Sequence, residues 1–139
     1  MINYKNILSK NMLNVFIDIL KYIKKNGLSD GNHIYITFLT NHKRTIIPNW
    51  LKEKYTDEMT IIIQYEYYNL NLNKDSFEVT LSFNNVKADL NISYESILSF
   101  ADPSSNFGLK LKENKKNKKI KTTNKKTNNV IEFSNYKKN

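Results

Sequence analysis

The first part of the chain has a helical repeat of apolar residues. Residues 4–25 carry two apolar stripes at 3.6-residue spacing, one of Ile7, Leu8, Met12, Val15, Ile19 and Tyr22 and one of Leu13, Phe16, Leu20 and Ile23. Asn26 and Gly27 follow as a helix stop, because glycine adopts positive φ at low cost. One stripe is enough to pack a helix on its own domain. The second predicts either contact with a partner helix or deep burial of this helix within its own domain.

The pattern changes to that of β-strands after residue 32. Alternating and β-branched residues predict strands over residues 33–40, 59–66, 68–73, 77–83, 86–93 and 107–111. A short helical turn is predicted over residues 48–55, a tight hairpin at Asn84-Asn85, a connector over 94–100 and a turn over 101–105. One helix followed by five or six short strands predicts a mainly β (α+β) fold, either a small barrel or a sandwich.

The composition changes sharply after Leu111. Residues 112–129 contain almost no apolar side chains except Ile120, so they predict a disordered linker that has too little apolar surface to fold. Apolar residues return over residues 130–138, at the tip of this tail. Their return is either chance or a short linear docking motif.

The net charge of +9 suggests nucleic-acid binding until it is located along the chain. Residues 1–109 carry ten lysines and one arginine against eleven acidic residues, and are neutral. Residues 110–139 carry eleven lysines against Glu113 and Glu132, which accounts for the whole excess. The basic tail is typical of a solvated segment, with a functional basic arm as the alternative.

Several chemical classes are disfavoured. The chain has no cysteine, and its two histidines, His33 and His42, have no second ligand at metal-binding spacing, so we expect no metal or other cofactor. Three glycines are too few for a phosphate-binding loop, and no nucleophile motif occurs, so we expect no enzyme. No apolar run is long enough for a membrane span, and the N-terminal stretch does not resemble a signal peptide. A cytoplasmic location is the expectation.

An ordered set of short motifs resembles one family. The motifs are H-x-Y-I-T-F (33–38), P-x-W-L (48–51), E-M-T-I (58–61), V-T-L-S-F-N-N-V (79–86), F-A-D-P-S (100–104) and F-G-L (107–109). Together they resemble the alphaproteobacterial branch of the SspB, or stringent starvation protein B, family. The resemblance implies a non-enzymatic adaptor that hands ssrA-tagged proteins to the ClpXP protease. It also implies an N-terminal helix followed by a small Sm-like β-barrel.

The resemblance divides the chain into three parts. Residues 1–111 would form the degron-binding and dimerisation domain, 112–129 the basic linker, and 130–139 a tail that docks on the N-terminal domain of ClpX. The residues expected to dock are Val130, Ile131, Phe133, Tyr136 and Lys137. A homodimer would form through the N-terminal helix, with Leu13, Phe16, Ile17 and Leu20 as the expected interface.

The degron groove is expected along two strands. A receptor for an unfolded peptide needs an exposed strand or groove with pockets for side chains. The segments around residues 37–40 and 80–85 suit that role, and we expect contacts from Thr37, Phe38, Thr40, Leu81, Ser82, Phe83 and Asn84. The alternative is that Phe38, Leu81 and Phe83 belong to the core.

Two other functions stay open at this point. An Sm-like RNA-binding module would need positive charge on the folded domain, which is neutral. A dimerisation module without cargo is the other. The linker departs from the family, whose linkers are commonly longer and acidic or rich in Pro and Ala. Lys87 and Asn106 stand where the family often has Pro and Val, which should leave the fold unchanged. We expect no specific nucleic-acid or membrane partner.

Overall fold

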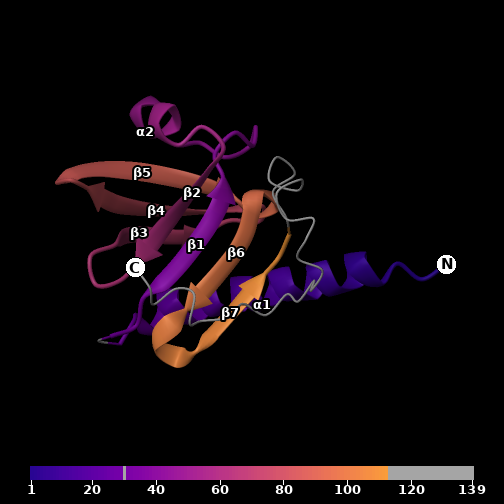
Figure 1. The fold of residues 1–139 in the computed structure, drawn as a ribbon. Helices are drawn as coiled ribbons and strands as arrows, with labels where there is room; N and C mark the ends of the chain where they lie inside the picture. Colours follow the sequence, from indigo (N-terminus) through magenta and orange to yellow (C-terminus); the bar gives the residue numbers. More distant parts are fainter. Residues whose placement is uncertain (30, 113–139) are drawn as a thin grey trace.

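A long helix followed by antiparallel strands makes up the fold (Figure 1). The structure is a computed structural model that describes residues 1–29 and 31–112, so the predicted linker after Lys112 and the docking tail lie outside the described residues. The elements are α1 (Tyr4–Asn26), β1 (Ile34–Leu39), α2 (Asn49–Lys54), β2 (Glu58–Ile63), β3 (Tyr68–Leu72), β4 (Ser76–Phe83), β5 (Val86–Ser93), β6 (Ile97–Asp102) and β7 (Phe107–Lys110). Short 3₁₀ turns at Tyr94–Ser96 and Pro103–Ser105 flank β6.

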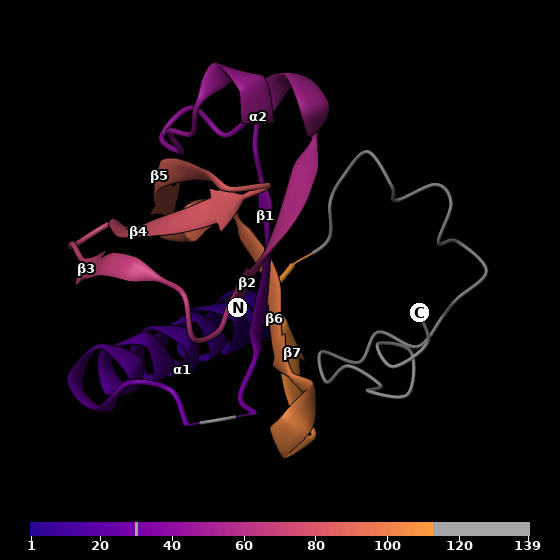
Figure 2. The same cartoon turned by 90° about the vertical axis from the view of Figure 1, so that its left-hand side faces the viewer.

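The strands form two antiparallel sheets. One has the order β2-β1-β6-β7 and the other the order β3-β4-β5. A bridge between Ile46 and Asn91 connects β5 to the loop before α2, with N–H···O distances of 2.8 and 2.9 Å. Figure 2 shows the three-stranded sheet on one side of the four-stranded sheet, with α1 and α2 at opposite ends. The predicted mainly β fold with an N-terminal helix is confirmed, and its strands are divided between these two sheets.

One stripe of α1 packs into the core between the sheets. Phe16 and Leu20 are fully buried, and the Phe16 ring contacts Phe77 and Phe100 at centroid distances of 6.0 and 5.2 Å. The helix begins where the Asn6 N–H donates to Asn3 Oδ1 at 3.1 Å. It ends where Gly27, at a φ of 76°, donates its N–H to the Ile23 carbonyl. Positive φ at that stop is the conformation that glycine favours.

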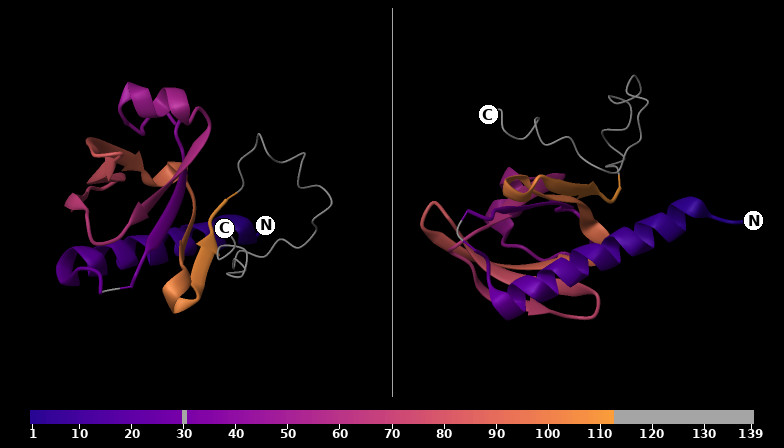
Figure 3. Two further views of the ribbon diagram at one scale, coloured as in Figure 1. Left: turned by 60° about the vertical axis from the view of Figure 1, so that its left-hand side comes forward. Right: turned by 90° about the horizontal axis from the view of Figure 1, so that it is seen from below.

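The two apolar stripes of α1 have different environments. Met12, Phe16, Leu20 and Ile23 face the core, and Leu13 and Ile17 are partly buried against it. Of the stripe that begins at Ile7, Met12 is buried and Ile19 is partly buried against the core. The rest of that stripe is exposed, at Ile7, Leu8, Val15 and Tyr22, as is Tyr4. The N-terminal part of α1 also extends beyond the sheets (Figure 3). Phe16 and Leu20, which we expected at a dimer interface, are therefore core residues, and the exposed apolar surface lies on the neighbouring face of the helix.

The strand β6 differs from the sequence prediction. Residues 97–102 lie between β1 and β7 in the middle of the larger sheet, whereas the sequence predicted a connector there. Residues 97 and 98 are both buried, as are 100 and 101, so the strand lacks the alternation that marks a half-exposed strand. The hairpin at Asn84-Asn85 is confirmed, since both residues have positive φ, at 53° and 67°.

Candidate functional site

A groove runs between the free edge of β2 and the end of β4. It has a volume of about 380 Å³, within the range of about 300–1,000 Å³ typical of ligand sites. Its lining combines apolar and aromatic side chains with a few polar ones: Tyr55, Met59, Thr60, Ile61, Ile62, Gln64, Tyr65, Glu66, Leu81, Ser82 and Phe83. Glu66 is the charged member of this set. The groove therefore offers apolar contact along a strand edge.

The backbone of β2 forms one wall of this groove. β2 pairs with β1 on one side, and no strand among residues 1–29 and 31–112 pairs with its other side. An unpaired edge presents N–H and C=O groups that an extended chain can pair with. The wall is thus a template for a peptide in extended conformation.

Three of the seven expected degron contacts line the groove. Leu81 is nearly buried in its floor, Ser82 is exposed, and Phe83 is half-buried. For Phe83 the sequence left core and groove open, and the side chain takes part in both, because it packs against the core and lines the groove.

The other four expected contacts lie elsewhere. Phe38 is fully buried in the core, and Asn84 lies in the hairpin turn beyond the groove. The Thr37 hydroxyl shares a hydrogen bond of 2.7 Å with the hydroxyl of Thr60 across the β1–β2 pair. Thr40 is buried and donates its hydroxyl to the Tyr55 carbonyl at 2.6 Å. Thr37 and Thr40 thus contact the groove residues Thr60 and Tyr55 but do not themselves line the groove.

The sequence did not assign the β2 side of the groove. It predicted the strand itself, but nothing in its pattern indicated that β2 lies at a sheet edge facing β4. The contribution of Tyr55, at the end of α2, was missed for the same reason. The structure shows Tyr65 to be 76% exposed beside the groove, which the sequence pattern did not indicate.

Comparison with known proteins assigns the family. The model of stringent starvation protein B, SspB, matches residues 7–138. The chain belongs to the SspB family. A comparison with curated proteins found no match. The SspB family is one of adaptors rather than enzymes, so membership indicates an adaptor role connected with ClpXP.

A second hollow lies on the outer face of β4 and β5. Its lining is mostly polar: Ile46, Asn69, Asn71, Glu78, Val79, Thr80, Asp89, Leu90 and Asn91. Several of these groups satisfy one another. The Asn69 amide donates to the Thr80 hydroxyl at 3.3 Å, and that hydroxyl donates to Asp89 at 2.7 Å. Such a surface is typical of the solvated side of a sheet.

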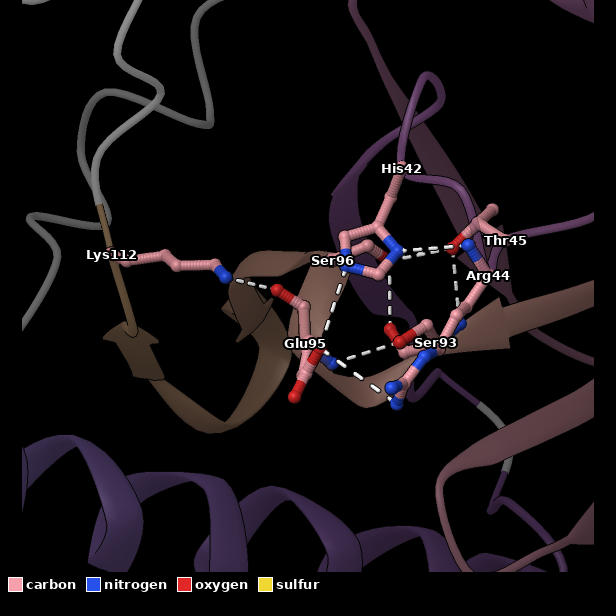
Figure 4. Close-up of polar contacts among 7 residues, drawn as sticks. All are labelled: His42, Arg44, Thr45, Ser93, Glu95, Ser96 and Lys112. Carbon is pink, nitrogen blue, oxygen red and sulfur yellow. Dashed lines mark hydrogen bonds and ion pairs between the residues drawn. The ribbon is translucent and has the colours of Figure 1, made fainter.

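A cluster of polar side chains surrounds the 3₁₀ turn at Tyr94–Ser96 (Figure 4). Three buried residues form its base: Thr45 donates its hydroxyl to Ser96 Oγ at 2.9 Å, and Ser96 donates to the Ser93 carbonyl at 2.7 Å. Above them, Nζ of Lys112 donates to the carbonyl of Glu95, while the Lys112 N–H donates to the Leu98 carbonyl at 3.1 Å. Lys112 is therefore held beside the 3₁₀ turn that precedes β6.

His42, the histidine of this cluster, contacts Arg44 and Glu95. Nδ1 of His42 accepts the Arg44 N–H at 3.1 Å, and its Nε2 lies 3.6 Å from the Glu95 carboxylate. Arg44 is 4.0 Å from the same carboxylate oxygen. Within residues 1–29 and 31–112, no three His, Cys, Asp or Glu side chains gather as metal ligands would. In that same part of the chain, neither helix has the length and apolarity to cross a membrane.

Proposed function

We propose that this chain is a non-enzymatic, cytoplasmic adaptor that binds ssrA-degron peptides and tethers tagged proteins to ClpXP. The observation that carries the proposal is a groove with apolar, aromatic and polar lining along an unpaired strand edge in a chain of the SspB family. The peptide lies extended along β2, pairs with its backbone, and places alternate side chains into the groove. Leu81, Ser82 and Phe83 form the opposite wall.

The proposed tether begins far enough from the groove to leave it open. β2 and β7 are the two edges of one sheet, and Lys112 follows β7. Three strand spacings of about 4.8 Å separate these edges by roughly 14 Å. Cargo bound along β2 therefore leaves the start of the linker unobstructed.

The proposed linker acts through effective concentration. Residues 112–129 would span on the order of 25 Å r.m.s. as a flexible chain, and more if their lysines repel one another. Residues 130–139 would dock on the N-terminal domain of ClpX through Val130, Ile131, Phe133, Tyr136 and Lys137. Docking would then hold cargo near the protease at an effective concentration of order mM. Delivery lowers the apparent KM of the protease and leaves its chemistry unchanged.

The proposed homodimer uses the exposed stripe of α1. Tyr4, Leu8, Val15 and Tyr22 lie on one face of the helix and are 73%, 50%, 40% and 65% exposed. Asn11 and Asp18 lie between them on the same face. Exposed apolar side chains on one face of a projecting helix are typical of a helix–helix interface. A second copy of the same helix would cover this face, and the dimer would then carry two grooves and two tails.

Peptide binding tests the proposal directly. A labelled peptide with the ssrA-tag sequence of the source organism, titrated with the full chain, should saturate at one peptide per protomer. A scrambled peptide of the same composition is the control. Equal binding of the two peptides, or of neither, would contradict the proposal.

A further inference from the structure

An exposed tryptophan stands next to the groove, outside the residues that line it. Trp50 lies on α2 and is 43% exposed. Its ring meets the ring of Phe83 edge to face, with centroids 6.3 Å apart and planes at 77°. Phe83 in turn lines the groove. The apolar surface of the groove is therefore continuous, across Phe83, with the exposed face of Trp50.

The packing of α2 does not require this tryptophan to be exposed. Leu51, 1% exposed, is the buried residue that anchors the helix to the core. The following positions, Lys52, Glu53 and Lys54, are charged and exposed, as expected on a solvated face. A tryptophan beside them exposes a large apolar ring to water. Tryptophan and tyrosine are the residues most enriched among those that dominate binding energy at interfaces.

The aromatic residues at this end of the groove are held rigidly. The Tyr55 N–H donates to the Leu51 carbonyl at 2.8 Å, and its own carbonyl accepts from Thr40 at 2.6 Å. Phe83 precedes the tight turn at Asn84-Asn85, which fixes the end of β4. A rigid aromatic surface loses little conformational entropy when a ligand covers it. We call Trp50, Tyr55 and Phe83 the aromatic shelf.

We propose that the aromatic shelf is the specificity-determining end of the groove, and that Trp50 contacts the bound peptide directly. The shelf takes a large apolar side chain, aromatic or branched aliphatic. This inference rests on the proposed function, because it assumes that the groove binds the degron peptide. It adds the residue that selects the peptide and the side chain that is selected.

Trp50 is the chain's one tryptophan, so its fluorescence reports on the shelf alone. The ssrA-tag peptide, added to the full chain, should shift Trp50 emission to shorter wavelength and reduce its quenching by iodide. If Trp50 only packs against Phe83 and does not contact the peptide, iodide should quench it equally with and without peptide. Peptide binding with unchanged emission and unchanged quenching overturns the inference.

A double-mutant cycle identifies the peptide residue on the shelf. Trp50→Ala should weaken binding of the ssrA peptide roughly tenfold, while Trp50→Phe should stay within about threefold of the original. One alanine substitution in the peptide, at a large apolar residue, should cost roughly tenfold with the unaltered protein and under about threefold with Trp50→Ala. Full additivity at every peptide position overturns the inference. So does an unchanged affinity of Trp50→Ala.

Two controls separate this inference from the proposed function. Ile46→Ala removes an exposed apolar side chain, 63% exposed, at the polar hollow, and should leave affinity unchanged. The thermal unfolding of each variant checks folding, and the fluorescence of the unaltered protein stands even if Trp50→Ala fails to fold. If the unaltered chain binds no ssrA peptide, the proposed function fails. If the chain binds the peptide but Trp50 emission, its quenching and the affinity of Trp50→Ala are all unchanged, only the inference about the aromatic shelf fails.

Discussion

The ring of Phe16 on α1 lies against the ring of Phe100 on β6, with centroids 5.2 Å apart and planes at 49°. Both side chains are buried, at 0% and 1% exposure. This contact attaches the long helix to the central strand of the four-stranded sheet. One face of α1 is therefore part of the domain's own core, while Leu8 and Val15 on the outer face remain exposed for contact with a partner.

Removing the Phe16 ring should therefore unfold the domain before it affects association. Phe16→Ala should lower the free energy of unfolding by about 3–5 kcal/mol, since a buried aromatic ring is lost and a cavity remains. Urea denaturation monitored by circular dichroism measures this. An unchanged unfolding midpoint together with a dissociated dimer would place Phe16 at the interface after all.

The outer stripe of α1 should behave in the opposite way. Leu8→Glu or Val15→Glu should weaken the proposed homodimer by at least about tenfold, because a charge would be buried against the partner helix. The monomer should keep its stability, since both side chains are exposed. Sedimentation velocity over a concentration series gives the result. Asn14→Glu, on the polar face of the same helix, is the matched control and should leave the dimer intact.

A bulky residue at the rim of the groove should block the peptide. Ser82 is exposed and lines the groove, so Ser82→Trp should fill the space between β4 and β2 without entering the core. We expect the affinity for the ssrA peptide to fall at least about tenfold, with an unchanged unfolding temperature. Ile46→Trp, of equal bulk at the polar hollow, should bind normally. Equal affinities of the two variants for the ssrA peptide would contradict peptide binding in the groove.

Alkaline pH should destabilise the fold through Tyr94. Burial, with the Asp75 carboxylate as the lesser cause, raises the pKa of the Tyr94 hydroxyl above its ordinary value of 10.0. The unfolded chain releases this proton near pH 10, whereas the folded chain retains it. The contribution to stability is thus fully present below pH 10, and is lost as the pH rises from there through the higher folded pKa.

Tyr94→Phe isolates that effect. The variant should lose about 1 kcal/mol at neutral pH, because the Tyr94 hydroxyl donates to the Asn73 carbonyl at 3.1 Å. Above pH 10 its stability should fall less steeply than that of the unaltered chain. Tyr65→Phe, at an exposed position, should follow the unaltered curve. Parallel slopes for all three proteins would show that Tyr94 does not titrate differently on folding.

Most of the fold could be predicted because its elements have regular periodicity. The helix, the short helix at Asn49–Lys54 and the strands β1 to β5 and β7 follow from 3.6-residue spacing, alternation and turn residues. The strand at residues 97–102 was missed because it is central. Ile97, Leu98, Phe100 and Ala101 are all buried, so the strand has no polar face to reveal its period.

The site was predicted less completely, since it depends on how distant strands meet. Alternation places Phe38 with Ile34 and Ile36 on one face of β1, and that apolar face is the buried one, which was the alternative for Phe38. The sequence predicted that Phe38 and Thr40 contact the peptide, but both side chains are buried. Leu81, Ser82 and Phe83 line the groove, whereas the facing wall, β2, depends on strand order that local pattern does not encode.

The most direct test of the adaptor role is delivery. Degradation of an ssrA-tagged fluorescent protein by ClpXP is followed over substrate concentrations from below to well above KM, with the full chain or with a variant that lacks residues 128–139. The account predicts that the full chain lowers KM severalfold at unchanged kcat, and that the shortened chain binds the ssrA peptide equally well but gives no acceleration. No acceleration by the full chain, or equal acceleration by both, would contradict it.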